Sequence, residues 1–107
     1  MGRLLIGVDV GGTKIAAALV NGQGNIQGRV YSPTDVASPE MAVRSIAQAI
    51  EAAMAVASSR RRDIVAIGLG LPGKVDPKRG IGVLSVNLGW RDMPVKDMLE
   101  ERLGIPC

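Results

Sequence analysis

The sequence predicts an α/β domain built on a mixed sheet, and three observations support this fold class. Apolar segments separated by glycine-containing turns occupy residues 3–10, 13–20 and 25–33, as in an antiparallel meander. A helical pattern then begins at Pro39 and ends near Ser58-Ser59. An apolar run from Asp63 to Leu71 follows, and the order strand, helix, strand implies a parallel crossover. The sheet should therefore hold three antiparallel strands first and a parallel strand after them.

Glycine and asparagine mark the turns between the first three strands. The first turn holds the pair Gly11-Gly12, and the second is the segment Asn-Gly-Gln-Gly-Asn at 21–25. The third strand is more polar than the other two, so we expect it at an edge of the sheet.

The long helix has recognisable start signals. Ser38 can cap it, Pro39 suits its first position, and Glu40 adds a negative charge to the first turn. Apolar residues recur at helical spacing, so one face should pack on the sheet: Val43, Ile46, Ala47, Ile50, Met54 and Ala57.

The strand from Asp63 to Leu71 is continuously apolar, which is typical of a strand covered on both faces. Pro72-Gly73-Lys74 follows at its carboxyl end, where ligands gather in open α/β sheets. A short hairpin should come next, in which residues 74–75 pair toward residues 83–84.

Three predictions concern the remainder of the chain. Residues 85–90 should form a loop, and residues 94–103 a second helix that Gly104 ends. Residues 105–107 should begin another strand.

Composition excludes several classes of function. The 107 residues make one small domain with a net charge of +3, one Trp, one Tyr and no Phe. Nucleic-acid binding would require clustered basic residues with aromatic platforms, so no nucleic acid is expected as a partner. Without histidine and with Cys107 as the single cysteine, the chain holds no zinc site of those ligands and no histidine base.

The same counts bear on location. A single cysteine rules out an internal disulfide and indicates the cytoplasm. No apolar run approaches the roughly 18 residues of a membrane span, so no membrane association is expected. The chain enters a strand almost at once, which argues against a signal peptide.

The segment Gly7-Val8-Asp9-Val10-Gly11-Gly12-Thr13-Lys14 carries the chemistry of the N-terminal half. A buried strand ends at an acid, turns on two glycines and returns as a second strand. Glycine lacks a Cβ atom and tolerates positive φ, so the amides of Gly11 and Gly12 can point together at one ligand. Asp9 suits a Mg²⁺ ion carried by a nucleotide, and Thr13 and Lys14 add a hydroxyl and a cation. The pattern predicts a phosphate-binding hairpin.

Two better-known glycine loops fit less well. A Walker loop needs Gly-Lys-Ser/Thr, but here Thr13 precedes Lys14. The dinucleotide fingerprint needs glycines that are absent, and both loops open a helix, whereas the turn at 21–25 comes too early for one. An ordinary hairpin, in which Asp9 only supports the turn, remains the alternative.

A second motif identifies a family. It comprises Gly-Leu-Gly-Leu-Pro-Gly-Lys-Val-Asp at 68–76, followed by Ser-Val-Asn-Leu-Gly-Trp at 85–90. Together with the segment 7–14, it closely resembles the N-terminal domain of the ROK family, which includes bacterial sugar kinases, ATP-dependent glucokinases and sugar-sensing repressors. The first motif is shared with the wider actin and sugar-kinase superfamily, and the second is more specific to ROK proteins. The resemblance covers essentially the whole chain, 1–107. It implies a ribonuclease-H-like domain of the actin-like ATPase type.

The resemblance also implies roles for individual residues. Asp9, Gly11, Gly12 and Thr13 match the segment that meets the phosphates of ATP and Mg²⁺, with Lys14 adjacent. The loops that face the sugar are matched by Gly73, Lys74 and Asn87. An amide such as that of Asn87 can both donate and accept, which suits vicinal hydroxyls. Each sugar-side residue also has a simpler interpretation: a turn glycine, a solvated lysine and a loop cap.

The chain departs from the family pattern in one respect. In ROK kinases the catalytic base is an Asp in an Asn-Asp pair shortly beyond the position of Cys107, and no such pair occurs here. No catalytic residue is therefore assigned within this chain, and the chain alone is expected to be inactive. The C-terminal domain, which would hold adenosine and a structural zinc, is expected in a longer parent protein.

The expected parent is a cytoplasmic, homodimeric hexose kinase that uses ATP and Mg²⁺, with glucose as the expected substrate. One alternative is a sugar-sensing ROK regulator, although only Met1-Gly2-Arg3 precede the first strand, where a DNA-binding segment would lie. Another is a non-catalytic sugar-binding module. The fragment alone is expected to self-associate through an exposed sheet edge.

Overall fold

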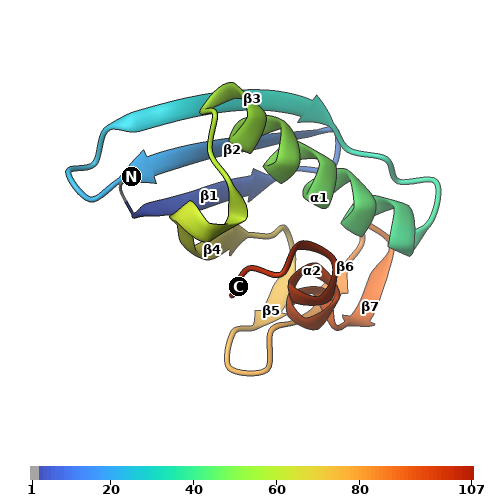
Figure 1. Ribbon diagram of the computed structural model, residues 1–107. Helices are drawn as coiled ribbons and strands as arrows, with labels where there is room; N and C mark the ends of the chain where they lie inside the picture. The colour runs from blue at the N-terminus through green and yellow to red at the C-terminus, as the bar shows by residue number, and fades with distance from the viewer. Residues whose placement is uncertain (1–2) are drawn as a thin grey trace.

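The computed structural model describes residues 3–107 and contains two sheets and two α-helices (Figure 1). Met1 and Gly2, which precede the first strand, lie outside the described residues. The larger sheet has the strand order β3-β2-β1-β4, in which β2 is antiparallel to β1 and β3, and β4 is parallel to β1. The predicted mixed sheet is thereby confirmed. Its strands are β1 (Leu4–Val10), β2 (Lys14–Asn21), β3 (Ile26–Pro33) and β4 (Ile64–Gly70).

Helix α1 (Pro39–Val56) packs on one face of this sheet (Figure 1). The hydroxyl of Ser38 caps it by accepting a hydrogen bond from the Met41 amide at 3.1 Å, as predicted. The core between helix and sheet is aliphatic, and each such side chain contributes about 1.5–3 kcal/mol when fully buried. The fully buried members include Ile6, Ile15, Leu19, Ile46 and Ile50.

The other face of the sheet is uncovered within the described residues. Leu5 is 52% exposed and Val65 is 46% exposed. The prediction that the strand at 63–71 is covered on both faces is therefore wrong for this chain, because α1 covers one face and no described element covers the other. The strand also begins later than predicted, because Arg61–Asp63 form a short 3₁₀ helix, η1.

The smaller sheet is antiparallel and contains β5 (Lys74–Asp76), β6 (Ile81–Ser85) and β7 (Trp90–Met93). The predicted hairpin is confirmed, since Lys74 pairs with Leu84. Strand β7 was not predicted. The indole of Trp90 is buried, and its N–H donates to the Pro39 carbonyl at 3.0 Å, which joins this sheet to the start of α1.

Helix α2 (Val95–Leu103) ends at Gly104 as predicted, because Gly104 adopts a left-handed φ of 69°. Residues 105–107 do not form the predicted strand. A single backbone hydrogen bond, from the Ile67 amide to the Pro106 carbonyl at 2.8 Å, places them along the free edge of β4. Pro106 has no amide to donate, which limits ladder formation.

Candidate functional site

The turn between β1 and β2 is tight, and its glycines are required for space. The Gly11 amide donates to the Lys14 carbonyl at 2.9 Å, and a Cβ atom on Gly11 would lie 2.9 Å from that same oxygen. A Cβ atom on Gly12 would lie 3.1 Å from the Cβ atom of Asn87. Neither glycine has a positive φ. The expectation that positive φ explains them is therefore corrected, because close approach of neighbouring atoms is the constraint.

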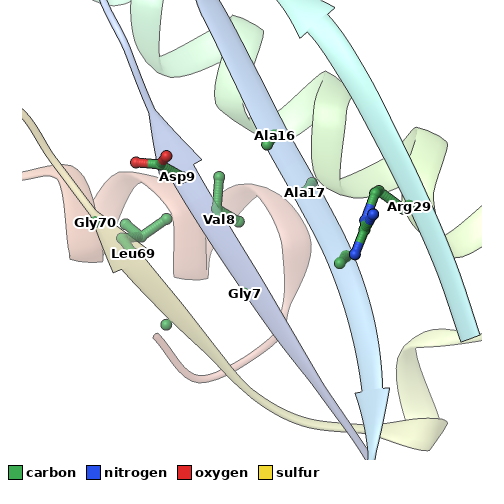
Figure 2. Close-up of a pocket in the computed structure, with 10 residues that line it drawn as sticks. Gly7, Val8, Asp9, Ala16, Ala17, Arg29, Leu69 and Gly70 are labelled. Carbon is green, nitrogen blue, oxygen red and sulfur yellow. The ribbon is translucent and has the colours of Figure 1, made fainter. Parts of the chain in front are cut away.

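Asp9 lies near the end of β1, beside Gly70 of β4, as Figure 2 shows. A Cβ atom on Gly70 would lie 3.8 Å from Oδ1 of Asp9, so the bare glycine leaves space next to the carboxylate. Within residues 3–107, this exposed carboxylate makes no hydrogen bond or ion pair. It borders a hollow of about 430 Å³ on the uncovered face of the sheet, lined mostly by small residues: Gly7, Ala16, Ala18, Gly68 and Gly70.

Lys14 differs from the other residues of the turn because its side chain has a protein partner. Its ammonium nitrogen lies 5.8 Å from the centroid of the Tyr31 ring, within the range of a cation–π interaction. Tyr31 is 63% exposed on β3, so this pair lies on the surface and contributes at most about 1 kcal/mol.

The three residues expected to face a sugar share a second hollow. Gly73, Lys74 and Asn87 line a depression of about 270 Å³ together with Pro72, Ser85 and Val86. Gly73 has a φ of 97°, and a Cβ atom there would collide with the carbonyl oxygen of Leu84. Glycine is therefore required at this position by the fold itself, whether or not a ligand approaches it.

The two groups of residues meet at one contact. The position of a Cβ atom on Gly12 lies 3.4 Å from Cγ and 3.6 Å from Nδ2 of Asn87. The turn after β1 is thus packed directly against the loop after β6. The structure thus brings the turn expected to bind phosphate into contact with the loop expected to face a sugar, although the sequence singled out the two separately.

One residue of this region was missed. Thr34, which follows β3, donates its hydroxyl to the Gly11 carbonyl at 2.8 Å and its amide to the Thr13 carbonyl at 2.9 Å. It is 23 positions away from Gly11, so no local spacing pattern could connect the two.

Other chemistry near these hollows is limited. Within residues 3–107, no group of three His, Cys, Asp or Glu side chains is placed to hold a metal ion. A divalent cation at Asp9 would therefore need further oxygens from its own ligand. Burial, and then the charge of Glu100, raises the pKa of the Cys107 thiol, which lies in a different hollow beside Lys96. Over the described residues 3–107, neither α1 nor α2 combines the length and the apolar sequence that a membrane-spanning helix needs.

A family profile described as the ROK family matches residues 5–107. The chain belongs to the ROK family. Over 103 residues it is 42% identical to a glucokinase of Streptomyces coelicolor, and the alignment covers 96% of this chain and 31% of that protein. It is also 34% identical to a putative xylose repressor of Caldicellulosiruptor sp., covering 96% of this chain and 26% of the repressor. This ROK chain thus spans about a third or less of these relatives.

A solved structure gives the same result for the fold. The crystal structure of a ROK family glucokinase from Streptomyces griseus, in complex with glucose and AMPPNP, superposes with a TM-score of 0.82 at 37% identity. The match covers 96% of this chain and 31% of that one. The predicted actin-like ATPase fold is confirmed.

Proposed function

We propose that this ROK chain, residues 1–107, is the N-terminal part of an ATP-dependent hexose kinase. The parent would transfer the γ-phosphoryl group of ATP to the 6-hydroxyl of a hexose, with glucose as the first candidate. The observation that carries the proposal is the contact between Gly12 and Asn87, because it sets a turn suited to phosphate beside a hollow suited to a polyhydroxyl ligand. The glucokinase relative, and the related structure holding glucose and AMPPNP, support it.

On the phosphate side, the free carboxylate of Asp9 would hold the Mg²⁺ that ATP carries, and the amides of the turn would meet phosphate oxygens. Mg²⁺ usually takes only one or two carboxylates and completes its shell with water and phosphate. Gly11, Gly12 and Thr13 supply the backbone of that turn, and Lys14 would contribute positive charge nearby. Bound Mg²⁺ would supply charge neutralisation for phosphoryl transfer.

On the sugar side, the side-chain amide of Asn87 would donate to one hydroxyl and accept from another. Lys74 offers three donors, and the backbone at Gly73 permits close approach. Exposed Val86 at the rim would contact the apolar face of a sugar ring.

The base that accepts the proton of the sugar hydroxyl would come from a segment beyond Cys107. Phosphoryl transfer depends on several parts positioned together, including a group that orients the nucleophile. We therefore infer that the 107-residue chain alone is inactive. The parent would be a cytoplasmic homodimer whose second domain binds adenosine and a structural zinc.

The repressor relative favours one alternative, a ROK regulator that binds sugar without phosphorylating it. The two functions differ in a direct way. A regulator would bind a sugar and retard a DNA fragment in a gel-shift assay, whereas a kinase would consume ATP in a hexose-dependent manner.

The experiment is an ATP-consumption assay of the full-length protein against a panel of hexoses. We expect glucose-dependent turnover, and we expect Asp9→Asn to lower kcat/KM for ATP by about a hundredfold, because the negative charge and one carboxylate oxygen near Mg²⁺ are lost. Asp92→Asn is the matched control, since Asp92 has a φ of 50°, which asparagine also tolerates. Absence of turnover with every hexose would sink the kinase proposal.

A further inference from the structure

Thr34 holds the turn after β1 from outside that turn. Its two hydrogen bonds reach two different carbonyls, that of Gly11 through the hydroxyl and that of Thr13 through the amide. The Gly11 amide is held separately by the Lys14 carbonyl at 2.9 Å. The turn is therefore fixed at three points along its backbone.

The bond from the Thr34 hydroxyl determines where the free amide of Gly12 points. In a planar trans peptide, the carbonyl and the following N–H point in opposite directions. Because the Gly11 carbonyl points at Thr34, the Gly12 amide points away from Thr34. The amides of Gly12 and Thr13 donate to no backbone carbonyl among residues 3–107. They remain available to an anionic ligand.

Thr34 is itself held by the helix. The next amide, that of Asp35, donates to the hydroxyl of Ser45 at 2.8 Å, and this hydroxyl donates to the Met41 carbonyl at 3.1 Å. Ser45 is 4% exposed, so its hydroxyl is well ordered by its surroundings. Hydrogen bonds at Ser45 and at Thr34, joined by the peptide bond between Thr34 and Asp35, thus connect α1 to the turn.

We propose that Thr34 is a positioning residue for phosphate binding, which orients the Gly12 amide without touching the ligand. This inference rests on the proposed function, because it assigns the phosphates of ATP to that turn. A preorganised turn loses less conformational freedom on binding, so disrupting it should weaken the nucleotide more than the sugar.

The test uses the full-length protein and two substitutions of similar size. Thr34→Val removes the hydroxyl and retains the shape and the backbone amide, whereas Thr34→Ser retains the hydroxyl. We expect Thr34→Val to raise KM for ATP by about fivefold or more, with less than a twofold change in KM for glucose. We expect Thr34→Ser to behave like the parent. Ser59→Ala is the control, because Ser59 also donates to a backbone carbonyl, at 3.3 Å, but lies near a different hollow.

A second readout does not depend on catalysis. Amide hydrogen exchange of the ligand-free protein should become faster in the peptide spanning the turn in Thr34→Val and remain unchanged in Thr34→Ser. Equal rises of both KM values, equal effects of the two substitutions, or unchanged exchange would overturn the inference. If Thr34→Val does not fold, Ser45→Ala is tested instead. We expect it to raise KM for ATP by a smaller factor, and an unchanged KM would overturn the inference.

The two proposals fail in distinguishable ways. If the parent phosphorylates no hexose, the kinase proposal fails. The inference about Thr34 is then tested by comparing AMPPNP affinity and amide exchange in Thr34→Val and Thr34→Ser. If the parent is active but Thr34→Val keeps the KM for ATP, the inference about Thr34 fails alone.

Discussion

The bare Cα atom of Gly12 packs against the side chain of Asn87, so a Cβ atom at Gly12 would lie 3.1 Å from the Asn87 Cβ. This is tighter than most Cβ contacts in proteins, and the Asn87 side chain would have to shift by a few tenths of an ångström to relieve it. The turn after β1 and the loop after β6 are therefore coupled in position. Any substitution that separates them should affect both proposed ligands together.

Gly12→Ala should accordingly raise KM for ATP and for the hexose in the full-length protein, each by roughly tenfold, since overpacking costs about 1–3 kcal/mol. Gly22→Ala is the control, because no atom lies within 4 Å of a Cβ atom there. Adding Asn87→Gly to Gly12→Ala removes the Cβ atom that lies 3.1 Å away and should restore part of the ATP affinity, which steady-state kinetics would measure. Strict additivity of the two substitutions would contradict the coupling.

Gly73→Ala should destabilise the fold by more than Gly89→Ala. Both glycines have positive φ, which costs an alanine about 1 kcal/mol or more. At Gly73 the added atom also collides with the Leu84 carbonyl, whereas nothing lies within 4 Å at Gly89. Urea unfolding of both variants measures the difference, and equal destabilisation would show that the loop at 73 relaxes freely.

Trp90→Ala should lower the free energy of unfolding by about 3–5 kcal/mol, because a fully buried aromatic side chain is removed. Trp90→Phe should cost less, although the Pro39 carbonyl loses the indole donor at 3.0 Å. Tyr31→Ala should change stability by no more than about 1 kcal/mol, since Tyr31 is 63% exposed and loses only its surface contact with Lys14. Denaturation followed by circular dichroism makes the comparison, and similar losses for Trp90→Ala and Tyr31→Ala would contradict the assigned anchor role.

Local patterns were sufficient for the larger sheet and both helices. Alternating apolar residues in β1, the Ser38 cap and the stop at Gly104 each act within a few residues, so the sequence predicts them well. The motif at 7–14 likewise predicted the turn after β1. The structure adds that Thr34 holds the backbone of this turn by two hydrogen bonds.

Long-range contacts explain the predictions that were wrong or absent. Trp90 starts β7 because its ring lies over Gly82 and its N–H reaches Pro39, 51 positions away. Thr34 reaches Gly11 across 23 positions. The prediction that both faces of β4 are covered was also wrong. An apolar strand sequence shows that both faces can be buried, but it does not show which element would cover each face.

The 107-residue chain should self-associate through the free edge of β4. Among residues 3–107, the segment that follows α2 contributes one backbone hydrogen bond to this edge, from the Ile67 amide to Pro106. Exposed Val65 adds apolar surface to the same strand. A lysine on an edge strand disfavours pairing with another chain, so Val65→Lys should lower the apparent mass in light scattering at high concentration. Gln27→Lys, on exposed β3 at the opposite edge of the sheet, is the matched control. If the unsubstituted 107-residue chain is monomeric at all concentrations, or if both lysine substitutions have equal effects, pairing at β4 is contradicted.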